Sequence, residues 1–362
     1  MATADRLPAI AQARQQVLLE GRTHALPGLA PWLQRGWQRC MAWDLSPRQR
    51  VGFEAVSAAR MRQVQEASQP LVQAARPVLA ELVRAMGNIG YFAILTNAEG
   101  VVVDVHGPVD RSDRRADVIA RVGVDLSERA VGTSAISAAL TELQPVWLHR
   151  GEHFFDDTGV YSCAGAPVFG PDGQCAGMLD LTGVEVVERP ALKHLVRRAA
   201  RSIENGWLLA APHALTLRLN WPGNQPGDDS DGLLTLDADG HITGANPTAR
   251  QMLSLDIHDT QSHASDVFAM PWESLFDAAR RDRGQCEVPL WSGLRLQTQA
   301  HRADVAPAAA SGPRSSGKAL RDVETELIRQ AVLKAKGNVA EAARTLGISR
   351  ATVYRKLGGG KA

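Results

Sequence analysis

The sequence predicts an α+β chain of several domains that ends in an all-α, three-helix module. Short strand-like runs occur in pairs joined by turn residues such as NAEG or PDG, which predicts antiparallel hairpins. Stretches between them repeat apolar residues every three or four positions, the spacing of amphipathic helices. The length of 362 residues allows two or three domains, and no run is apolar enough to cross a membrane.

Helical spacing dominates the first part of the chain. Residues 1–50 are predicted as an N-terminal helical segment, and the helical pattern continues to residue 86. Pro70 and Pro77 are expected to interrupt or kink it.

The period changes at Tyr91, where two hairpins begin. YFAILT pairs with VVVDVH and CAGAPVFG with QCAGMLDLTG, while VGTSAISAALTEL between them is helical and PVWLH strand-like. An apolar stripe from Leu192 to Trp207 predicts a closing helix. Helices that flank an antiparallel sheet predict an α+β sensor domain over residues 51–212.

The next segment is predicted as a linker followed by a second, smaller α+β domain. WPGNQPGDDSDG is rich in Pro, Gly and Asp, so residues 213–230 are expected to be the linker. Residues 231–302 repeat the strand–turn–strand–helix order, with Asn246 placed to cap a helix that begins at Pro247. Residues 303–318, rich in Ala, Pro, Gly and Ser, predict a flexible linker.

Charge is distributed unevenly along the chain. From Arg314 to the end there are eleven Lys and Arg residues against four acids, so this segment carries +7 and the rest of the chain, whose total is +1, carries −6. A small basic module on an acidic body is expected of a protein that contacts nucleic acid. A solvated charged helix is the alternative explanation of the charge alone.

The segment GNVAEAARTLGISRATVYRKL predicts two packed helices joined by a short turn. Gly347 ends the first helix, Ser349 caps the second, and Val353 lies on its inner face. Because the second helix is basic on its free face, residues 319–358 are predicted to form a DNA-binding helix-turn-helix, with a generic cationic three-helix bundle as the alternative. The residues predicted to contact bases or phosphates are Asn338, Ser349, Arg350, Thr352, Tyr354, Arg355 and Lys356.

This segment closely resembles the Fis-type helix-turn-helix, whose familiar form runs GN…AA..LGISR.T.YRKL. The resemblance implies double-stranded DNA as a partner and a homodimer paired largely through the preceding helix, where Leu327, Ile328 and Ala331 are the candidates. Two copies are then expected to meet half-sites about one DNA turn apart.

The stretch GPRSSGKA at residues 312–319 matches the phosphate-binding pattern GxxxxGK[ST] at every position except the last. A working phosphate loop needs a buried strand before it and a hydroxyl after the lysine to hold magnesium. Here a linker precedes the stretch and Ala319 replaces the hydroxyl. We interpret the match as accidental and expect no ATPase activity.

A second resemblance covers the predicted sensor. GVDLSERAVGTSAISAALTELQPVWLHRGEHFFDDTGVYSCAGAPVFGPDGQCAGMLDLTG resembles the GAF domain of acetoin-catabolism-type bacterial regulators, which are sigma-54 enhancer-binding proteins. RGWQRC resembles their upstream tryptophan motif, and GLLTLDADGHITGANPTARQML resembles the first half of a PAS domain. Ser134 replaces the usual Asn, and CAGAP replaces CSAAP. Those regulators carry an AAA+ ATPase where this chain has only a linker.

The GAF-like domain is expected to hold a pocket for a small organic effector. The residues predicted to line it are Thr133, Trp147, His149, His153 and Cys163, with core packing as the alternative role of Trp147. The acids of EHFFDD, with His153 and Cys163, offer iron or zinc ligands, but a hydrogen-bonded loop over the pocket is favoured and no metal is assigned. Cys163 and Cys175 lie on adjacent predicted strands, where buried thiols are favoured over a redox pair.

These features together predict a cytoplasmic, homodimeric bacterial transcription regulator, with no catalytic residues and no cofactor. It would sense a small molecule or a regulatory protein and bind operator DNA without ATPase activity. It would then act by occupancy, through RNA polymerase, or by pairing with a full-length relative that contains the ATPase. The alternatives are a thiol enzyme that reduces methionine sulfoxide with Cys163 as nucleophile, and an architectural DNA-binding protein.

Overall fold

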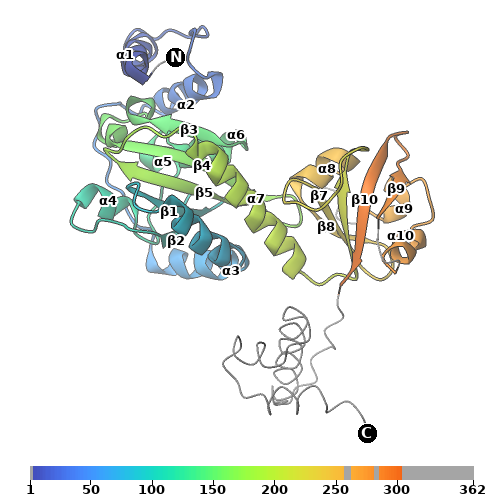
Figure 1. Cartoon of the computed structure of the whole chain (residues 1–362). Helices are drawn as coiled ribbons and strands as arrows, with labels where there is room; N and C mark the ends of the chain where they lie inside the picture. The colour runs from blue at the N-terminus through green and yellow to red at the C-terminus, as the bar shows by residue number, and fades with distance from the viewer. Residues whose placement is uncertain (1–2, 257–261, 281–284, 304–362) are drawn as a thin grey trace, which may run out of the picture. The chain divides into compact units, whose positions relative to one another are not determined.

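The computed structural model of the chain describes residues 3–256, 262–280 and 285–303. They contain two five-stranded antiparallel sheets with flanking helices, which confirms the α+β class (Figure 1). The module at 319–358 and nearly all of the linker predicted at 303–318 lie outside the described residues. No helix within the described ranges is long and apolar enough to cross a membrane.

Helices precede the first sheet, as the sequence predicts. They are α1 (Thr3–Arg14), the π-helical turn η1 (Gln15–Leu19), α2 (Pro31–Ala42) and α3 (Ala58–Met86). α3 runs through both Pro70 and Pro77 as a single helix, which corrects the expected interruption. Each proline removes a backbone hydrogen bond, but α3 buries Leu71, Leu79 and Leu82 in the core, and this packing holds the helix together.

The first sheet contains both predicted hairpins. Its strands are β1 (Tyr91–Asn97), β2 (Val102–His106), β3 (Val146–His149), β4 (Tyr161–Phe169) and β5 (Cys175–Val184). They are ordered β2-β1-β5-β4-β3, and all neighbours are antiparallel. The turns NAEG and PDG close the two hairpins, as predicted.

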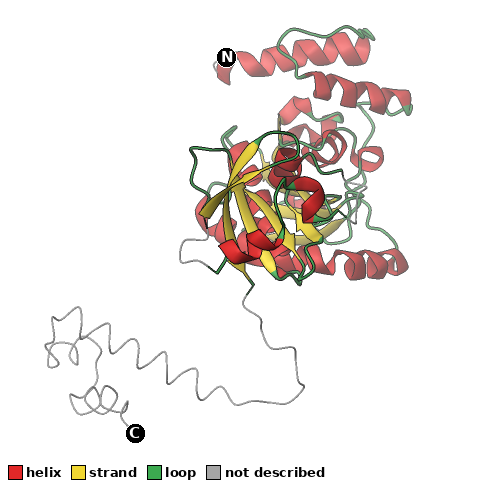
Figure 2. Ribbon diagram, turned by 90° about the vertical axis from the view of Figure 1, so that its right-hand side faces the viewer, coloured by secondary structure: helices red, strands yellow, loops and turns green. Residues whose placement is uncertain are grey.

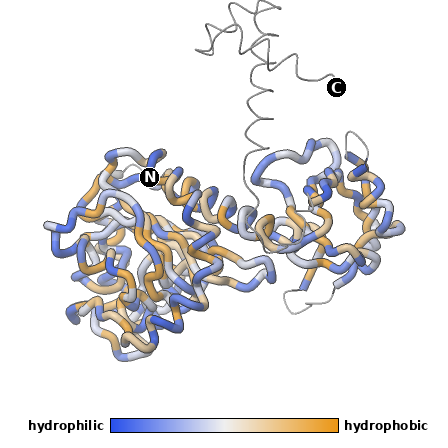
Figure 3. Tube along the Cα trace, turned by 90° about the horizontal axis from the view of Figure 1, so that it is seen from below, coloured by the Kyte–Doolittle hydropathy of each residue, from blue (hydrophilic) through white to orange (hydrophobic). Residues whose placement is uncertain are grey.

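Helices cover both faces of the first sheet. Figure 2 shows helices, in red, around the strands, in yellow. On one face the core contains residues of α2, α4 (Arg114–Ile119), α5 (Glu128–Val131) and α6 (Ala135–Glu142). On the other face it contains residues of α3 and α7 (Leu192–Ala210). The 3-10 turns η2 (Arg150–Glu152) and η3 (Asp156–Val160) lie between β3 and β4. In Figure 3 the hydrophilic segments, in blue, lie mostly along the outer loops.

The second sheet begins earlier than predicted. Its strands are β6 (Leu215–Asn220), β7 (Gly232–Leu236), β8 (Ile242–Ala245), β9 (Gln285–Pro289) and β10 (Arg295–Arg302), in the order β8-β7-β6-β10-β9. The central strand β6 therefore lies inside the segment 213–230 predicted as a linker, which corrects that boundary. Leu215, Leu217 and Leu219 alternate along β6 and are buried, so the strand completes the core.

Short helices cover the second sheet. They are α8 (Pro247–Leu253), α9 (Ala264–Val267) and α10 (Glu273–Ala278). The Asn246 side chain accepts a hydrogen bond from the backbone N of Ala249, 2.8 Å away, so it caps α8 as predicted.

Candidate functional site

A small cavity lies in the core between the first sheet and the helices α5 and α6. Its volume is about 20 Å³, enough for roughly one water molecule. It is lined by Phe53, Ile119, Leu126, Val131, Ser134, Ala135, Ile136, His153, Thr158, Tyr161 and Cys163. Two of the five residues predicted to bind an effector, His153 and Cys163, are therefore brought together. We call this space the sensor cavity.

His153 carries a buried hydrogen-bond acceptor at the wall of the sensor cavity. Its Nδ1 lies 2.9 Å from the carbonyl oxygen of Arg150. Because a carbonyl oxygen only accepts, Nδ1 holds the proton and Nε2 is left as an acceptor. Burial lowers the pKa of His153 to about 4, so the ring is neutral at pH 7. Nε2 has no hydrogen-bond partner in the described part of the chain.

Cys163 belongs to a chain of buried polar groups that crosses from β4 to β5. Its Sγ lies 3.4 Å from Thr182 Oγ1, and the Thr182 hydroxyl donates a short hydrogen bond to Asp180 Oδ2. Burial raises the pKa of Asp180 to about 7 and the pKa of the Cys163 thiol well above its usual value. Since the thiolate is the reactive form of cysteine, Cys163 is a poor nucleophile here.

Trp147 and His149 lie on the opposite face of the sheet from Cys163. β3 pairs Leu148 with Cys163, and successive side chains of a strand point to opposite faces. Trp147 packs in the core beside α7, and His149 Nδ1 lies 2.7 Å from Ser162 Oγ. The expectation that all five predicted residues line one pocket is therefore corrected, because the sheet separates these two from the sensor cavity.

Thr133 is buried but does not line the sensor cavity. Its hydroxyl donates to Glu128 Oε1 at 3.2 Å and lies 3.4 Å from Cys40 Sγ. Gly36 of α2 approaches it so closely that a Cβ atom there would lie 2.6 Å from Thr133 Cγ2. Thr133 therefore forms part of the contact surface for α2.

The RGWQRC motif supplies the other half of that contact. Trp37 is buried, and its Nε1 donates to the carbonyl oxygen of Glu152 at 2.9 Å. Arg39 donates to both carboxylate oxygens of Glu128, at 2.8 and 3.0 Å. The tryptophan motif thus attaches α2 to the sensor domain on the side of the sensor cavity.

Two of the three acids of EHFFDD, Glu152 and Asp156, form ion pairs with arginines of the N-terminal helix. Arg6 Nη2 donates to both carboxylate oxygens of Glu152 at 2.8 Å, and Arg14 pairs with Asp156 at 2.6 Å. Arg14 also donates to three carbonyl oxygens of the same loop. Within the described ranges, no three His, Cys, Asp or Glu side chains are close enough together to hold a metal ion.

Cys163 and Cys175 are not in contact, although they lie on paired strands. β5 pairs Thr182 with Cys163 and Cys175 with Phe169. Phe169 is six residues along β4 from Cys163, a separation of about 20 Å at the usual rise of a strand. A disulfide between the two thiols would need a different strand register.

The cavity also contains residues that sequence reasoning missed. Phe53, Ser134 and Tyr161 come from three separate parts of the chain, and no local pattern connects them. Asp180 could have been singled out from the sequence, because it is the only acid within the apolar run GMLDLTG. In the structure its side chain is fully buried. The seven predicted DNA-contacting residues lie outside the described part, so their arrangement stays a prediction.

Two segments of the chain match known protein families. Residues 8–205 match the family described as MimR, N-terminal domain, and residues 319–358 match bacterial regulatory proteins of the Fis family. Among solved structures, a chain of the complex of E. coli DhaR(N) with DhaL aligns with a TM-score of 0.47 and 14% identity, over 76% of this chain and 100% of that one.

Named relatives are transcriptional regulators. The acetoin catabolism regulatory protein of Cupriavidus necator is 32% identical over 262 residues, which cover 70% of this chain and 38% of that protein. The propane 2-monooxygenase operon transcriptional activator MimR of Mycolicibacterium goodii is 28% identical over 196 residues, 54% of this chain and 32% of that protein. The matches thus cover about a third of the length of each relative. The predicted resemblances to the Fis-type segment and to acetoin-catabolism-type regulators are confirmed. The chain belongs to the family of the MimR N-terminal domain, with a Fis-family segment at its C-terminal end.

Proposed function

We propose that this protein is a transcription regulator that binds double-stranded DNA through residues 319–358. The observation that carries the proposal is the Fis-family match of this segment, together with the charge of +7 from Arg314 onward. Arg350, Thr352 and Arg355 would contact base edges, with Asn338, Ser349, Tyr354 and Lys356 beside them on bases or phosphates. A homodimer paired through Leu327, Ile328 and Ala331 would present two such helices to two half-sites.

We propose further that the sensor cavity is where a small effector acts. The neutral His153 offers an unpartnered acceptor, so the effector would be an uncharged molecule that carries a hydroxyl or N–H donor. A cavity of about 20 Å³ is too small for such a molecule, so binding would move the lining side chains. That rearrangement would be the signal, because packed cores change between discrete arrangements.

The regulator would act in the cytoplasm without an ATPase of its own. Between the two family matches the structure describes the second sheet, and the near-match to a phosphate loop lacks the hydroxyl that holds magnesium. The protein would therefore act by occupying DNA, by contacting RNA polymerase, or by pairing with a relative that has the ATPase. The raised pKa of Cys163 disfavours the thiol enzyme as an alternative.

Selection of duplexes from a random library by the full chain tests DNA recognition. We expect enrichment of a sequence with two half-sites about one DNA turn apart, and no enrichment by a variant with both Arg350→Ala and Arg355→Ala. Retention of duplexes without any enriched sequence would instead support the architectural protein.

The sensing proposal has its own test, the effect of small alcohols, diols and amides on the affinity for the selected duplex. We expect at least one such compound to change that affinity in the wild type. His153→Phe, which removes the acceptor and fills the cavity, should abolish the change, whereas exposed His241→Phe should preserve it. Equal responses of the two variants would reject His153 as the effector contact.

A further inference from the structure

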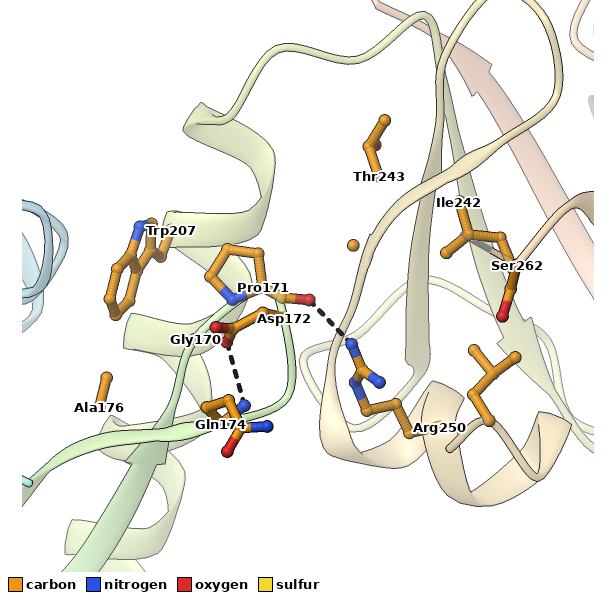
Figure 4. Close-up of a pocket in the computed structure, with 12 residues that line it drawn as sticks. Gly170, Pro171, Asp172, Gln174, Ala176, Trp207, Ile242, Thr243, Arg250 and Ser262 are labelled. Carbon is orange, nitrogen blue, oxygen red and sulfur yellow. Dashed lines mark hydrogen bonds between the residues drawn. The ribbon is translucent and has the colours of Figure 1, made fainter. Parts of the chain in front are cut away.

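A second, larger cavity lies between the β4–β5 turn of the first domain and the second sheet (Figure 4). Its volume is about 480 Å³, within the range of roughly 300–1,000 Å³ that is usual for small-molecule sites. Pro171 joins the two sides, because its carbonyl oxygen accepts from the backbone N of Ala245 at 3.1 Å. We call this space the junction cavity; it is separate from the sensor cavity.

Arg250 of α8 provides a cation in the wall of the junction cavity. Its Nε, Nη1 and Nη2 donate to the carbonyl oxygens of Ala245, Asp256 and Pro171 at 3.3, 3.3 and 3.2 Å. All three bonds are long, and they use three of the five N–H donors of the guanidinium. No carboxylate of a described residue forms an ion pair with it. Among the residues that the structure describes, Arg250 is therefore a partly desolvated cation without the bidentate acid partner that arginine prefers.

The rest of the wall restricts the kind of anion that fits. Trp207, Ile242 and Leu255 are half-buried and give the cavity an apolar surface. Figure 4 places Pro171 between the Trp207 ring and the Arg250 side chain. Asp172, on the β4–β5 turn, is an acid within the same lining, and its charge acts on Arg250 without a direct ion pair. Arg250 can balance one further negative charge, whereas a second negative charge on a ligand would be repelled by Asp172.

We propose that the junction cavity binds a small organic monocarboxylate. The carboxylate would accept from the two N–H donors of Arg250 that no described residue accepts from, and the apolar body would lie against Ile242, Leu255 and Trp207. Because the ligand would touch both the β4–β5 turn and α8, its binding would stabilise the contact between the two sheets. The chain would then have a second, chemically different input, since the sensor cavity offers an acceptor to a neutral donor.

The test is thermal unfolding of the full chain with benzoate and isobutyrate as probes, against benzamide and chloride at equal ionic strength. We expect at least one carboxylate to raise the unfolding midpoint saturably, by about 3 °C at ten times its Kd, because it binds the folded state alone. Benzamide has nearly the shape of benzoate without its charge and should have no effect. Inorganic phosphate, largely dianionic at pH 7.5, should also have none.

Three variants distinguish a ligand-binding role of Arg250 from a purely structural one, in which it only connects the two sides of the cavity. Arg250→Gln should abolish the carboxylate shift, and Arg280→Gln, an exposed arginine of the same domain, should preserve it. If Arg250→Gln fails to fold, Gln174→Trp adds bulk to the lining, leaves Arg250 intact, and should abolish the shift as well. The proposal is overturned if neither carboxylate shifts the midpoint beyond chloride, or if the folded variants at Arg250 or Gln174 respond as the wild type does.

Discussion

At the scale of single residues, Asp180 is the most unusual group in the first domain. It is a carboxyl without measurable exposure, in the middle of a five-stranded sheet, and its Oδ1 has no partner among the described residues. Burying a charged carboxylate is so unfavourable that the neutral form is favoured, and the pKa rises to about 7. The charge of this group therefore changes near physiological pH.

This raised pKa predicts how stability depends on pH. In the unfolded chain Asp180 has its ordinary pKa, so its stabilising contribution is complete below about pH 4 and is lost as the pH rises to about 7. Asp180→Asn cannot ionise and should escape this loss. The free energy of unfolding of the wild type relative to the variant should therefore fall between pH 4 and 7, by at most about 1.4 kcal/mol per unit.

Chemical denaturation at a series of pH values measures this difference directly. His153, whose pKa is lowered, acts in the opposite direction, but it is present in both proteins and cancels in the comparison. Parallel stability curves for wild type and Asp180→Asn would show that Asp180 keeps the same pKa in both states.

At the scale of elements, α2 depends on one glycine for its close approach to the sensor domain. A Cβ on Gly36 would lie 2.6 Å from Thr133, whereas one on Gly206, near the C-terminal end of α7, would meet nothing within 4 Å. Alanine is intrinsically the better helix former by about 1 kcal/mol at both positions. The two glycines therefore form a matched pair that separates packing from helix propensity.

We expect opposite effects of alanine at these two positions. Gly36→Ala should lower the free energy of unfolding by about 1–3 kcal/mol, because overpacking a closed contact forces backbone shifts. Gly206→Ala should leave it unchanged or raise it by up to about 1 kcal/mol. Urea titration of the first domain distinguishes them, and equal shifts of both midpoints would contradict the close packing of α2 on Thr133.

The elements could be predicted wherever the signal was local. Turn residues between paired strand-like runs predicted both hairpins of the first sheet, and Asn246 predicted the start of α8. β6 was not predicted, because its alternating leucines come directly before a Pro- and Gly-rich run that is typical of a linker, and both were assigned to the linker. Pro70 and Pro77 do not interrupt α3, because its buried face, a tertiary feature, outweighs two lost hydrogen bonds.

At the scale of the whole molecule, the two ends were predictable to different degrees. The Fis-family segment is a short, local pattern, and its family match confirms the resemblance. The sensor cavity depends on strand register: a shift of one residue exchanges the faces, which is why Trp147 and His149 fall outside it. Pro171, which accepts from Arg250, and Gly36, which packs against Thr133, come from distant parts of the chain, and the sequence pattern does not connect them with these residues.

The central claim is that this chain reads DNA through its C-terminal segment, and the affinity for the selected duplex tests it most directly. In fluorescence anisotropy of the full chain, the Kd for this duplex should increase steeply as the salt concentration rises. Arg350→Ala should weaken binding about 5- to 150-fold, and Lys361→Ala, outside the matched segment, should change it little. Equal affinities of Arg350→Ala and the wild type, or no binding to duplex DNA even at low salt, would contradict the account.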